Sequence, residues 1–246
     1  MHDLFSDRAN FYSSFRPGYS SALINHILSF VEEKKLAWDC ATGNGQAARL
    51  IAPHFDKVVA TDISARQLEL APRLSNVEYA IAPAEDSQLP ASSVNLITIA
   101  QAYHWLDAVR FNAEVLRVCA PKAVIAAWGY SMFYTDLTEF NELIQSFYTD
   151  KLGPYWNFER RLVDEHYKTI EFPYQPLPAL EELMSYSWTL EHLEGYLRSW
   201  SAVKNYTDQH NEDPVRPFID AARGIAPSEF IVHFPIFLRI GKVFAE

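Results

Sequence analysis

The chain has 246 residues, of which 49% are hydrophobic and 21% are charged, and a formal net charge of −10 at pH 7. It is long enough to bury a substantial core, and its acidic balance, without a run of Lys and Arg, argues against general binding to nucleic acid or to an anionic membrane. Two cysteines are too few for a disulfide scaffold, and the sequence has neither a signal-peptide pattern nor ~20 consecutive apolar residues, so the cytoplasm is the expected location.

Helices and strands are predicted to alternate through the first 130 residues, from the spacing of apolar side chains. In chain order, these are a helix over 20–35, a strand over 36–40, a helix over 45–53, a strand over 57–62, a helix over 64–74, strands over 77–82 and 94–100, a helix over 107–118 and a strand over 122–128. Ser64 is placed to cap the third helix, and Pro121 to form a turn before the last strand.

The predicted strands are apolar almost throughout, which is typical of a parallel sheet covered on both faces. The fold class is therefore a doubly wound α/β fold with a mostly parallel sheet. Ligands of such sheets bind beyond the carboxyl ends of the strands.

The alternation ends near residue 133, where helical patterns such as 137–147 and 190–200 and many aromatic residues begin. A strand pattern returns over 230–243 and predicts an antiparallel final strand. We therefore expect three segments: a nucleoside-binding core with an N-terminal lid (1–132), a helical cap insertion (133–225) and the final strand or strands of the sheet (226–246). The aromatic residues of the cap fit either simple packing on the sheet or an apolar substrate pocket.

A small-residue loop follows the first predicted strand and indicates a nucleoside site. Asp39 ends the strand, Gly43 and Gly45 follow in the loop, and Asp62 ends the second strand. Small residues let the backbone approach a ligand, and a carboxylate at the next strand accepts hydrogen bonds from ribose hydroxyls. The loop also fits the dinucleotide pattern G-x-G-x-x-A, but Asp39 would repel a pyrophosphate and suits a cofactor with a cationic amino group.

Residues 39–45 also resemble the acid-x-Gly-x-Gly-x-Gly motif of class I S-adenosylmethionine-dependent methyltransferases of type 11, with Ala41 in place of the first glycine. The resemblance implies a seven-stranded Rossmann-like sheet and S-adenosylmethionine as the cofactor. It also implies that Asp62 holds both ribose hydroxyls and that Ile63 lies beside the adenine.

Two further segments resemble the same family. Residues 84–90 match its Ala-Glu-x-x-x-Leu-Pro segment, which implies that Ala84 and Glu85 flank the adenine. Tyr12, Arg16 and Tyr19 match a Tyr-x-x-x-Arg-Pro-x-Tyr segment that closes over the cofactor. The guanidinium of Arg16 is also suited to pair with the carboxylate of the cofactor.

Residues 101–105, which read Gln-Ala-Tyr-His-Trp, resemble the branch that includes trans-aconitate methyltransferases. This adds Gln101, His104 and Trp105 to the expected cofactor site. His104 is the candidate catalytic base, or else a structural histidine that bonds to its loop, and Trp105 is expected to form a wall.

The function predicted from these features is methylation of a small molecule, with esterification of a carboxylic acid favoured over other O- or N-methylation. A carboxylate needs no base, whereas a hydroxyl or an amine does. One or two cations of the cap are candidates to hold an acid: Arg160, Arg161, Arg198 and Lys204. The alternatives are an NAD(P)-dependent oxidoreductase and a non-catalytic nucleoside-binding regulatory protein. No metal is expected, and the sequence does not indicate the oligomeric state.

Overall fold

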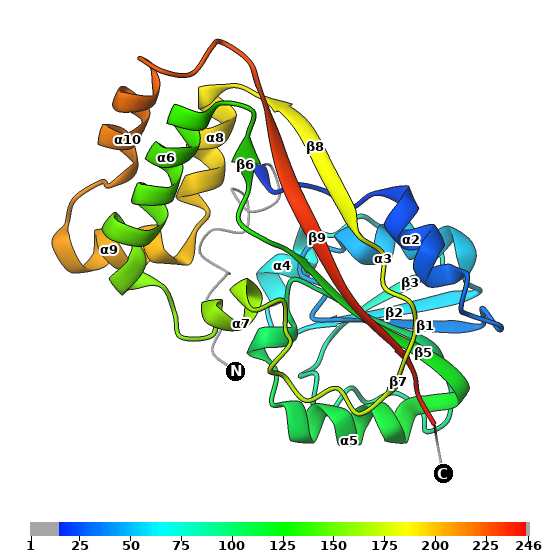
Figure 1. Cartoon of the computed structure of the whole chain (residues 1–246). Coiled ribbons are helices and arrows are strands. Elements are labelled where there is room, and N and C mark those ends of the chain that lie inside the picture. Colours follow the sequence, from blue (N-terminus) through cyan, green and yellow to red (C-terminus); the bar gives the residue numbers. More distant parts are fainter. Residues whose placement is uncertain (1–14, 245–246) are drawn as a thin grey trace.

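The computed structural model describes residues 15–244, and Tyr12 lies outside this range. The described chain forms one mixed sheet with helices on both faces and a helical region beyond one end (Figure 1). The strands are β1 (Leu36–Cys40), β2 (Lys57–Asp62), β3 (Val77–Ile81), β4 (Val94–Ala100), β5 (Cys119–Tyr130), β6 (Tyr134–Thr135), β7 (Gln175–Pro176), β8 (Glu182–Trp188) and β9 (Phe230–Lys242). The helices are α2 (Ser21–Leu28), α3 (Gln46–Ile51), α4 (Ala65–Glu69), α5 (Ala108–Val118), α6 (Thr138–Ser146), α7 (Arg160–Asp164), α8 (Leu190–Arg198), α9 (Ser201–His210) and α10 (Val215–Ala222).

The strand order is β3-β2-β1-β4-β5-β9-β6, with β7 and β8 also paired to β9. Strands β1 to β5 are parallel to one another, and β9 is antiparallel to β5. The predicted fold class, including the antiparallel final strand, is therefore confirmed. The central strands are buried on both faces, as their mostly apolar sequences require.

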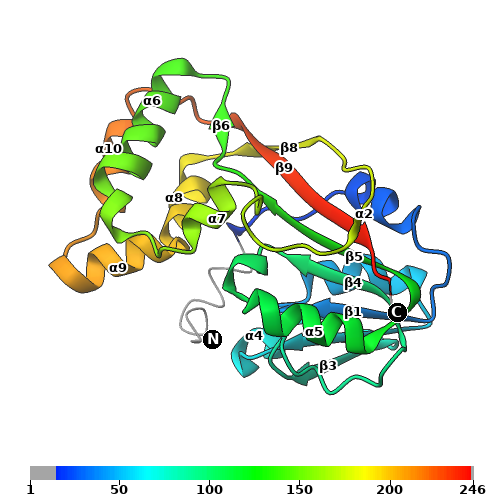
Figure 2. The same cartoon turned by 60° about the horizontal axis from the view of Figure 1, so that its bottom comes forward.

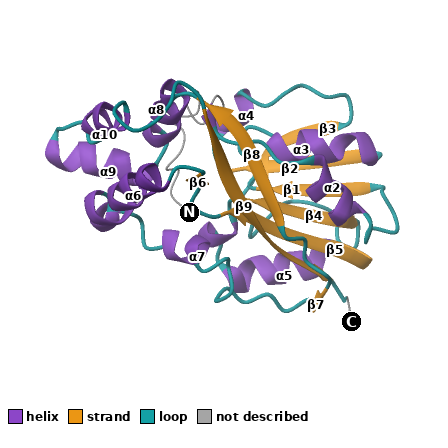
Figure 3. Cartoon of the chain, turned by 45° about the horizontal axis from the view of Figure 1, so that its top comes forward, coloured by secondary structure: helices purple, strands orange, loops and turns teal. Residues whose placement is uncertain are grey.

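The helices cover the two faces of the sheet in the way that the burial pattern indicates. Buried side chains of α2 and α3 pack with Ala37, Leu96 and Trp128 on one face, whereas α5 packs with Trp38 and Ile97 on the other. Figure 2 shows α5 and α2 on opposite sides of the sheet, and Figure 3 shows α5 on the face opposite to α2 and α3. No helix among residues 15–244 is long and apolar enough to cross a membrane.

Several predicted boundaries shift for local reasons. Helix α4 ends at Glu69, because Pro72 follows closely and disfavours the helical conformation before it. Strand β5 begins at Cys119 and runs through Pro121, so it starts earlier than the predicted strand over 122–128. The pairing with β4 is interrupted there: Cys119 lies opposite Val94 and Val124 opposite Leu96, so β5 has three extra residues between the two pairs. Lys122 has a φ of 63°, which is typical of the residue after the proline of a tight turn.

The segment 133–225 contains strands as well as the expected helices. Strand β8 pairs with β9 over its whole length, from Glu182 opposite Ile236 to Trp188 opposite Phe230. Its buried side chains alternate with exposed ones, the period-2 pattern of a strand with one covered face. The prediction of an entirely helical cap is therefore wrong, because this segment contains β6, β7 and β8. The division of the chain into three segments stays a prediction. Helices α6, α8, α9 and α10 gather beyond the end of the sheet (Figure 1).

Candidate functional site

A cavity lies at the carboxyl ends of β1, β2 and β4, where ligands of parallel sheets bind. We call it the strand-end cavity; its volume is about 930 Å³, counting the space open to solvent. Its lining comprises Tyr19, Ala41, Thr42, Gly43, Asn44, Gln46, Ala47, Asp62, Ile63, Ser64, Gln67, Ala82, Ala84, Ala100, Gln101, Ala102 and Trp105. Most of the predicted cofactor residues therefore meet at this one place.

The loop between β1 and α3 turns through left-handed backbone conformations. Ala41, Gly43 and Gly45 have φ angles of 52°, 57° and 78°. Gly45 does not line the cavity, and a Cβ there would lie 2.8 Å from the hydroxyl of Tyr79. Ala41 occupies a conformation that costs an L-residue about 1–2 kcal/mol, so this departure from the glycine motif is accommodated at the expense of some strain.

Asp62 joins the loop to the start of α4. Its Oδ2 accepts a hydrogen bond from the backbone N–H of Gly43 at 2.8 Å, and its Oδ1 accepts one from that of Ser64 at 2.9 Å. Ser64 in turn caps α4 by accepting from the N–H of Gln67, as predicted. The carboxylate lines the cavity while its position is fixed by the backbone, which suits it to accept bonds from ligand hydroxyls.

Asp39 is not among the residues that line the strand-end cavity, and its contact with a cofactor amino group stays a prediction. Its side chain is fully buried and accepts hydrogen bonds from Thr42 Oγ1 (2.5 Å), Thr98 Oγ1 (2.6 Å) and the backbone N–H of Ala48 (2.9 Å). It therefore holds the loop and the first turns of α3 to the sheet. Burial raises the pKa of the Asp39 carboxyl to about 6, although the three hydrogen bonds lower it.

The raised pKa of Asp39 predicts a pH-dependent contribution to stability. The folded carboxyl binds its proton more tightly than the unfolded one, so its contribution favours folding most below pH ~4 and decreases as the pH rises to about 6. The change is ~3 kcal/mol at 1.36 kcal/mol per pKa unit. Asp39→Asn should lack this decrease when urea unfolding of both proteins is compared from about pH 4 to pH 7. Parallel curves of unfolding free energy against pH would contradict the prediction.

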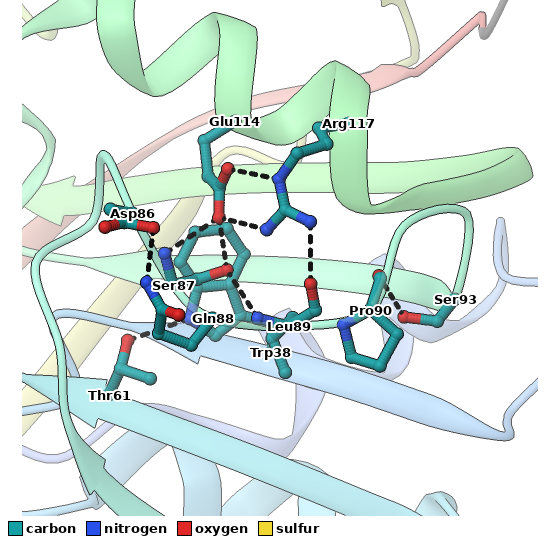
Figure 4. A network of polar contacts seen from close by, with 10 residues as sticks. All are labelled: Trp38, Thr61, Asp86, Ser87, Gln88, Leu89, Pro90, Ser93, Glu114 and Arg117. Carbon is teal, nitrogen blue, oxygen red and sulfur yellow. Dashed lines mark hydrogen bonds and ion pairs between the residues drawn. The ribbon is translucent and has the colours of Figure 1, made fainter.

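Residues 87–89, which follow the cavity-lining Ala84 in the same loop, are held by side chains of α5 (Figure 4). The Glu114 carboxylate accepts hydrogen bonds from the backbone N–H (2.7 Å) and hydroxyl (2.5 Å) of Ser87, and Arg117 donates to the carbonyl of Leu89. The ion pair with Arg117 lowers the pKa of Glu114 to about 2. The network fixes the loop, and with it the position of Ala84 in the wall of the strand-end cavity.

Glu85, which was expected beside the adenine, does not line the cavity. Its Oε1 accepts a hydrogen bond from the backbone N–H of Asp107 at 3.0 Å, at the start of α5. Its position is that of a helix-end partner, where a negative charge near the N-terminus is favourable.

A second pocket adjoins the strand-end cavity, since Gln101 and Trp105 line both. Its volume is about 550 Å³, counting the space open to solvent. The lining of this second pocket comprises Arg16, Gln101, His104, Trp105, Trp156, Asn157, Arg160, Val163, Trp200 and Ser201. It thus combines Arg16, from the N-terminal part of the chain, with residues that follow β4 and with residues of the segment 133–225.

Two arginines give the second pocket its charge. Arg16 donates from Nε to Ser199 Oγ at 3.1 Å and from Nη1 to the Tyr130 hydroxyl at 3.0 Å. Arg160 donates from Nε to the Tyr148 hydroxyl at 2.8 Å and forms an ion pair with Asp164 at 3.2 Å. Arg16 therefore lies in the second pocket and not, as expected, in the strand-end cavity.

The other cations considered in the cap face acidic partners and line neither pocket. The pairs are Arg161 with Glu165, Arg198 with Glu194 and Asp213, and Lys204 with Asp208. Arg160 is therefore the one member of that predicted group that the structure brings to the site.

His104 lies in the short 3₁₀ turn η3 (Tyr103–Trp105) and lines the second pocket. Its Nδ1 is 3.1 Å from the hydroxyl of Tyr167, and the two rings stack with centroids 5.8 Å apart. Burial, together with the charges of Arg160 and Arg16, lowers the pKa of His104 to about 3. The imidazole is therefore neutral at pH 7.

Sequence reasoning missed several residues of the site. Trp156 and Trp200 lie in a region whose many aromatic residues gave no reason to single them out. Gln67 lines the strand-end cavity, and its buried Oε1 has no hydrogen-bond partner among residues 15–244. Its position three residues after the capping Ser64 was the available signal, because the first turn of a helix at a strand end faces the ligand edge of the sheet. No group of three His, Cys, Asp or Glu side chains in the same part of the chain is placed to hold a metal ion.

Comparison with known proteins yields consistent similarities. A family described as a methyltransferase domain matches residues 38–127. A protein of Dictyostelium discoideum named as a methyltransferase is 32% identical over 98% of this chain and 95% of its own length. A protein of Saccharomyces cerevisiae named as an S-adenosylmethionine-dependent methyltransferase is 25% identical over 85% of this chain and 82% of its own. The solved structure of a protein from Anaeromyxobacter dehalogenans, described as a type II methyltransferase, is 36% identical, with a TM-score of 0.84 over 95% of this chain and all of that one.

Proposed function

Because the chain belongs to the S-adenosylmethionine-dependent methyltransferases, we propose that it methylates a small carboxylic acid bound in the second pocket. The observation that carries the acceptor class is the pair of guanidinium groups, Arg16 and Arg160, in that pocket. They stand out in a chain with a net charge of −10. Guanidinium groups match carboxylates with two parallel hydrogen bonds, which favours an anionic acceptor.

The strand-end cavity has the groups that the cofactor needs. Asp62 offers a fixed carboxylate for ribose hydroxyls, and Ile63 offers an apolar surface for the adenine. The orphaned Oε1 of Gln67 supports the same assignment, because a buried acceptor without a partner is costly unless a ligand satisfies it. Ala41, Gly43, Ala84, Gln101 and Trp105 complete the proposed set of contacts with the cofactor.

S-adenosylmethionine, when bound, supplies an electrophilic methyl carbon on a positively charged sulfur. The chain itself contributes alignment and the exclusion of water, because this displacement disperses charge and needs no strong acid or base. Arg16 and Arg160 would orient an ionised carboxylate. Gln101 and Trp105, which line both cavities, would set the direction from which it approaches the methyl group. The neutral His104 fits a reaction that requires no proton transfer, so we assign it no role as a base.

The resemblance of residues 101–105 to trans-aconitate methyltransferases supports a carboxylate acceptor as well. An oxyanion of another kind, such as a phenolate, fits the same charges less well, since phenols are mostly protonated at pH 7 and the pocket offers no base of suitable pKa. The predicted alternatives of an NAD(P)-dependent oxidoreductase and a non-catalytic nucleoside-binding protein are not supported by the family of the chain.

The proposed function predicts a base-labile product. The protein should be incubated with S-adenosylmethionine labelled in its methyl group and a panel of small carboxylic acids, with the matching primary amides as controls. Label should pass to acids only, and mild base should release it as methanol, because methyl esters hydrolyse under conditions that spare ethers and amines. A product that keeps its label in base would contradict ester formation. In parallel calorimetric titrations, S-adenosylmethionine and S-adenosylhomocysteine should bind and NAD should not.

A further inference from the structure

We propose that Tyr167 is a positioning residue that fixes the neutral His104 with its Nε2–H directed into the second pocket, as a hydrogen-bond donor to the acceptor. The inference rests on the proposed function in one respect, namely that this pocket holds the acceptor. It assigns to His104 the recognition of an anion, in place of the base catalysis expected from the sequence.

The orientation of the His104 ring supports this assignment. Its Nδ1 faces the hydroxyl of Tyr167 at 3.1 Å, and Tyr167 lines neither cavity. His104 itself lines the second pocket, and because Nδ1 faces Tyr167, Nε2 is the ring nitrogen left to bind a ligand there. Among the described residues, Nδ1 is the ring nitrogen of His104 for which a hydrogen bond is found.

The chemistry of the pair decides the direction of the hydrogen bond. A phenol is a good donor and a weak acceptor, whereas the unprotonated nitrogen of a neutral imidazole is a good acceptor. The stronger arrangement therefore has the Tyr167 hydroxyl donating to Nδ1. A neutral imidazole carries one proton, which must then lie on Nε2, as in other sites where the partner of one ring nitrogen sets the tautomer.

Two residues in left-handed backbone conformations follow α7, and the second of them, Tyr167, has its hydroxyl beside His104. Helix α7 ends in a Schellman motif, in which the N–H of Tyr167 donates to the carbonyl of Leu162 at 2.8 Å and that of His166 to Val163 at 2.9 Å. His166 and Tyr167 are both left-handed, with φ angles of 56° and 58°. Each such residue costs about 1–2 kcal/mol, and strain of this kind concentrates at functional sites.

Contacts around Tyr167 hold it in this conformation. Arg239 on β9 donates from Nη1 to the carbonyls of Tyr167 (2.5 Å) and Ile170 (2.6 Å). The Tyr167 ring is fully buried and packs edge-on against Phe237, with centroids 4.9 Å apart. The Tyr167 hydroxyl is therefore fixed by both the backbone and the ring. A shift of the His104 ring would break its hydrogen bond to this hydroxyl.

Together with the arginines, this arrangement surrounds the acceptor with donors. Arg16, Arg160 and the Nε2–H of His104 all belong to the second pocket, and at pH 7 each of these three groups can only donate a hydrogen bond. A carboxylate, which only accepts hydrogen bonds, satisfies all three at once. In a primary amide, an NH₂ group replaces one carboxylate oxygen and would place a donor against a donor, so the fixed tautomer favours acids over their amides.

The tautomer is measurable by ¹⁵N NMR of uniformly labelled protein, with the His104→Gln variant used to assign the signals. We expect a pyridine-like shift for Nδ1 and a pyrrole-like shift for Nε2 in the wild type, unchanged between about pH 5 and pH 8. In Tyr167→Phe this separation should decrease, because the donor that selects the tautomer is lost. Tyr174→Phe is the matched control, since it removes another buried tyrosine hydroxyl, which donates to Asn112 at 2.5 Å.

Steady-state kinetics supply a second measurement. Tyr167→Phe should raise the KM for the acid about fivefold, the equivalent of one hydrogen bond, and leave the affinity for S-adenosylmethionine unchanged. A pyridine-like Nε2 in the wild type would overturn the proposal without any variant, and so would a Tyr167→Phe protein that matches Tyr174→Phe in both measurements. The NMR experiment needs no acceptor, so a protein that shows the expected tautomer but methylates no acid contradicts the proposed function alone.

Discussion

Asp62→Ala is expected to lower the affinity for S-adenosylmethionine about 100-fold and to reduce turnover with it. Hydrogen bonds to a charged group contribute about 1.5–3 kcal/mol each, and the proposed role of this carboxylate includes bonds to two ribose hydroxyls. The substitution also removes the bonds that hold the backbone of Gly43 and Ser64, so the cavity loses part of its preformed shape. Calorimetric titration with S-adenosylmethionine and S-adenosylhomocysteine measures the change.

Asp56→Ala is the matched control, because Asp56 is an exposed acid just before β2 and lies outside both cavities. Its affinity for the cofactor should equal that of the wild type. Asp62→Asn should be intermediate, since the amide oxygen accepts hydrogen bonds but its NH₂ group cannot. An Asp62→Ala protein that is folded and binds S-adenosylmethionine as tightly as the wild type would remove Asp62 from the proposed site.

Arg160→Met should raise the KM for the carboxylic acid by roughly 10- to 100-fold, while the dissociation constant of S-adenosylmethionine stays unchanged. The expected loss is that of a charge-assisted hydrogen bond, about 1.5–3 kcal/mol. Methionine keeps much of the apolar volume beside Trp156, over whose ring the guanidinium lies at 5.1 Å. Initial rates at saturating cofactor, measured against acid concentration, give the result.

The neighbouring Arg161 provides a control for the Arg160 prediction. It carries the same charge and pairs with Glu165, but it lies outside the second pocket, so Arg161→Met should leave the KM of the acid unchanged. Equal effects of the two substitutions would indicate a general effect of charge and would contradict a specific clamp. Arg160→Lys should recover only part of the affinity, because an ammonium does not offer two parallel N–H groups.

Much of the fold could be predicted because it depends on local patterns. The strands β1, β2 and β4 have the predicted boundaries, since each is a short and mostly apolar run flanked by polar or small residues. Strand β8 was missed because its alternation is short and lies among aromatic residues that also fit helical packing. Its pairing with β9 involves residues about 50 positions away, which a local pattern does not report.

The candidate site was predictable only where it lies at the strand ends. Gly43 and Asp62 are placed by the sheet itself, whereas the orientation of a side chain at a strand end depends on its neighbours. The Asp39 side chain lies in the interior, where it accepts a hydrogen bond from the hydroxyl of Thr98, its neighbour on the adjacent strand β4. The second pocket was not predictable, because its arginines come together through tertiary contacts such as that of Arg16 with Ser199, 183 residues away.

We expect the wall shared by the two cavities to couple their occupancy. Gln101 and Trp105 face both spaces, so a ligand that shifts or orders either side chain changes the free energy of binding on the other side. Such coupling is reciprocal: the factor by which the cofactor alters the affinity for the acceptor equals the factor by which the acceptor alters the affinity for the cofactor. Demethylated cofactor retained beside this wall would therefore shift the affinity for the next acceptor molecule, which links product release to substrate selection.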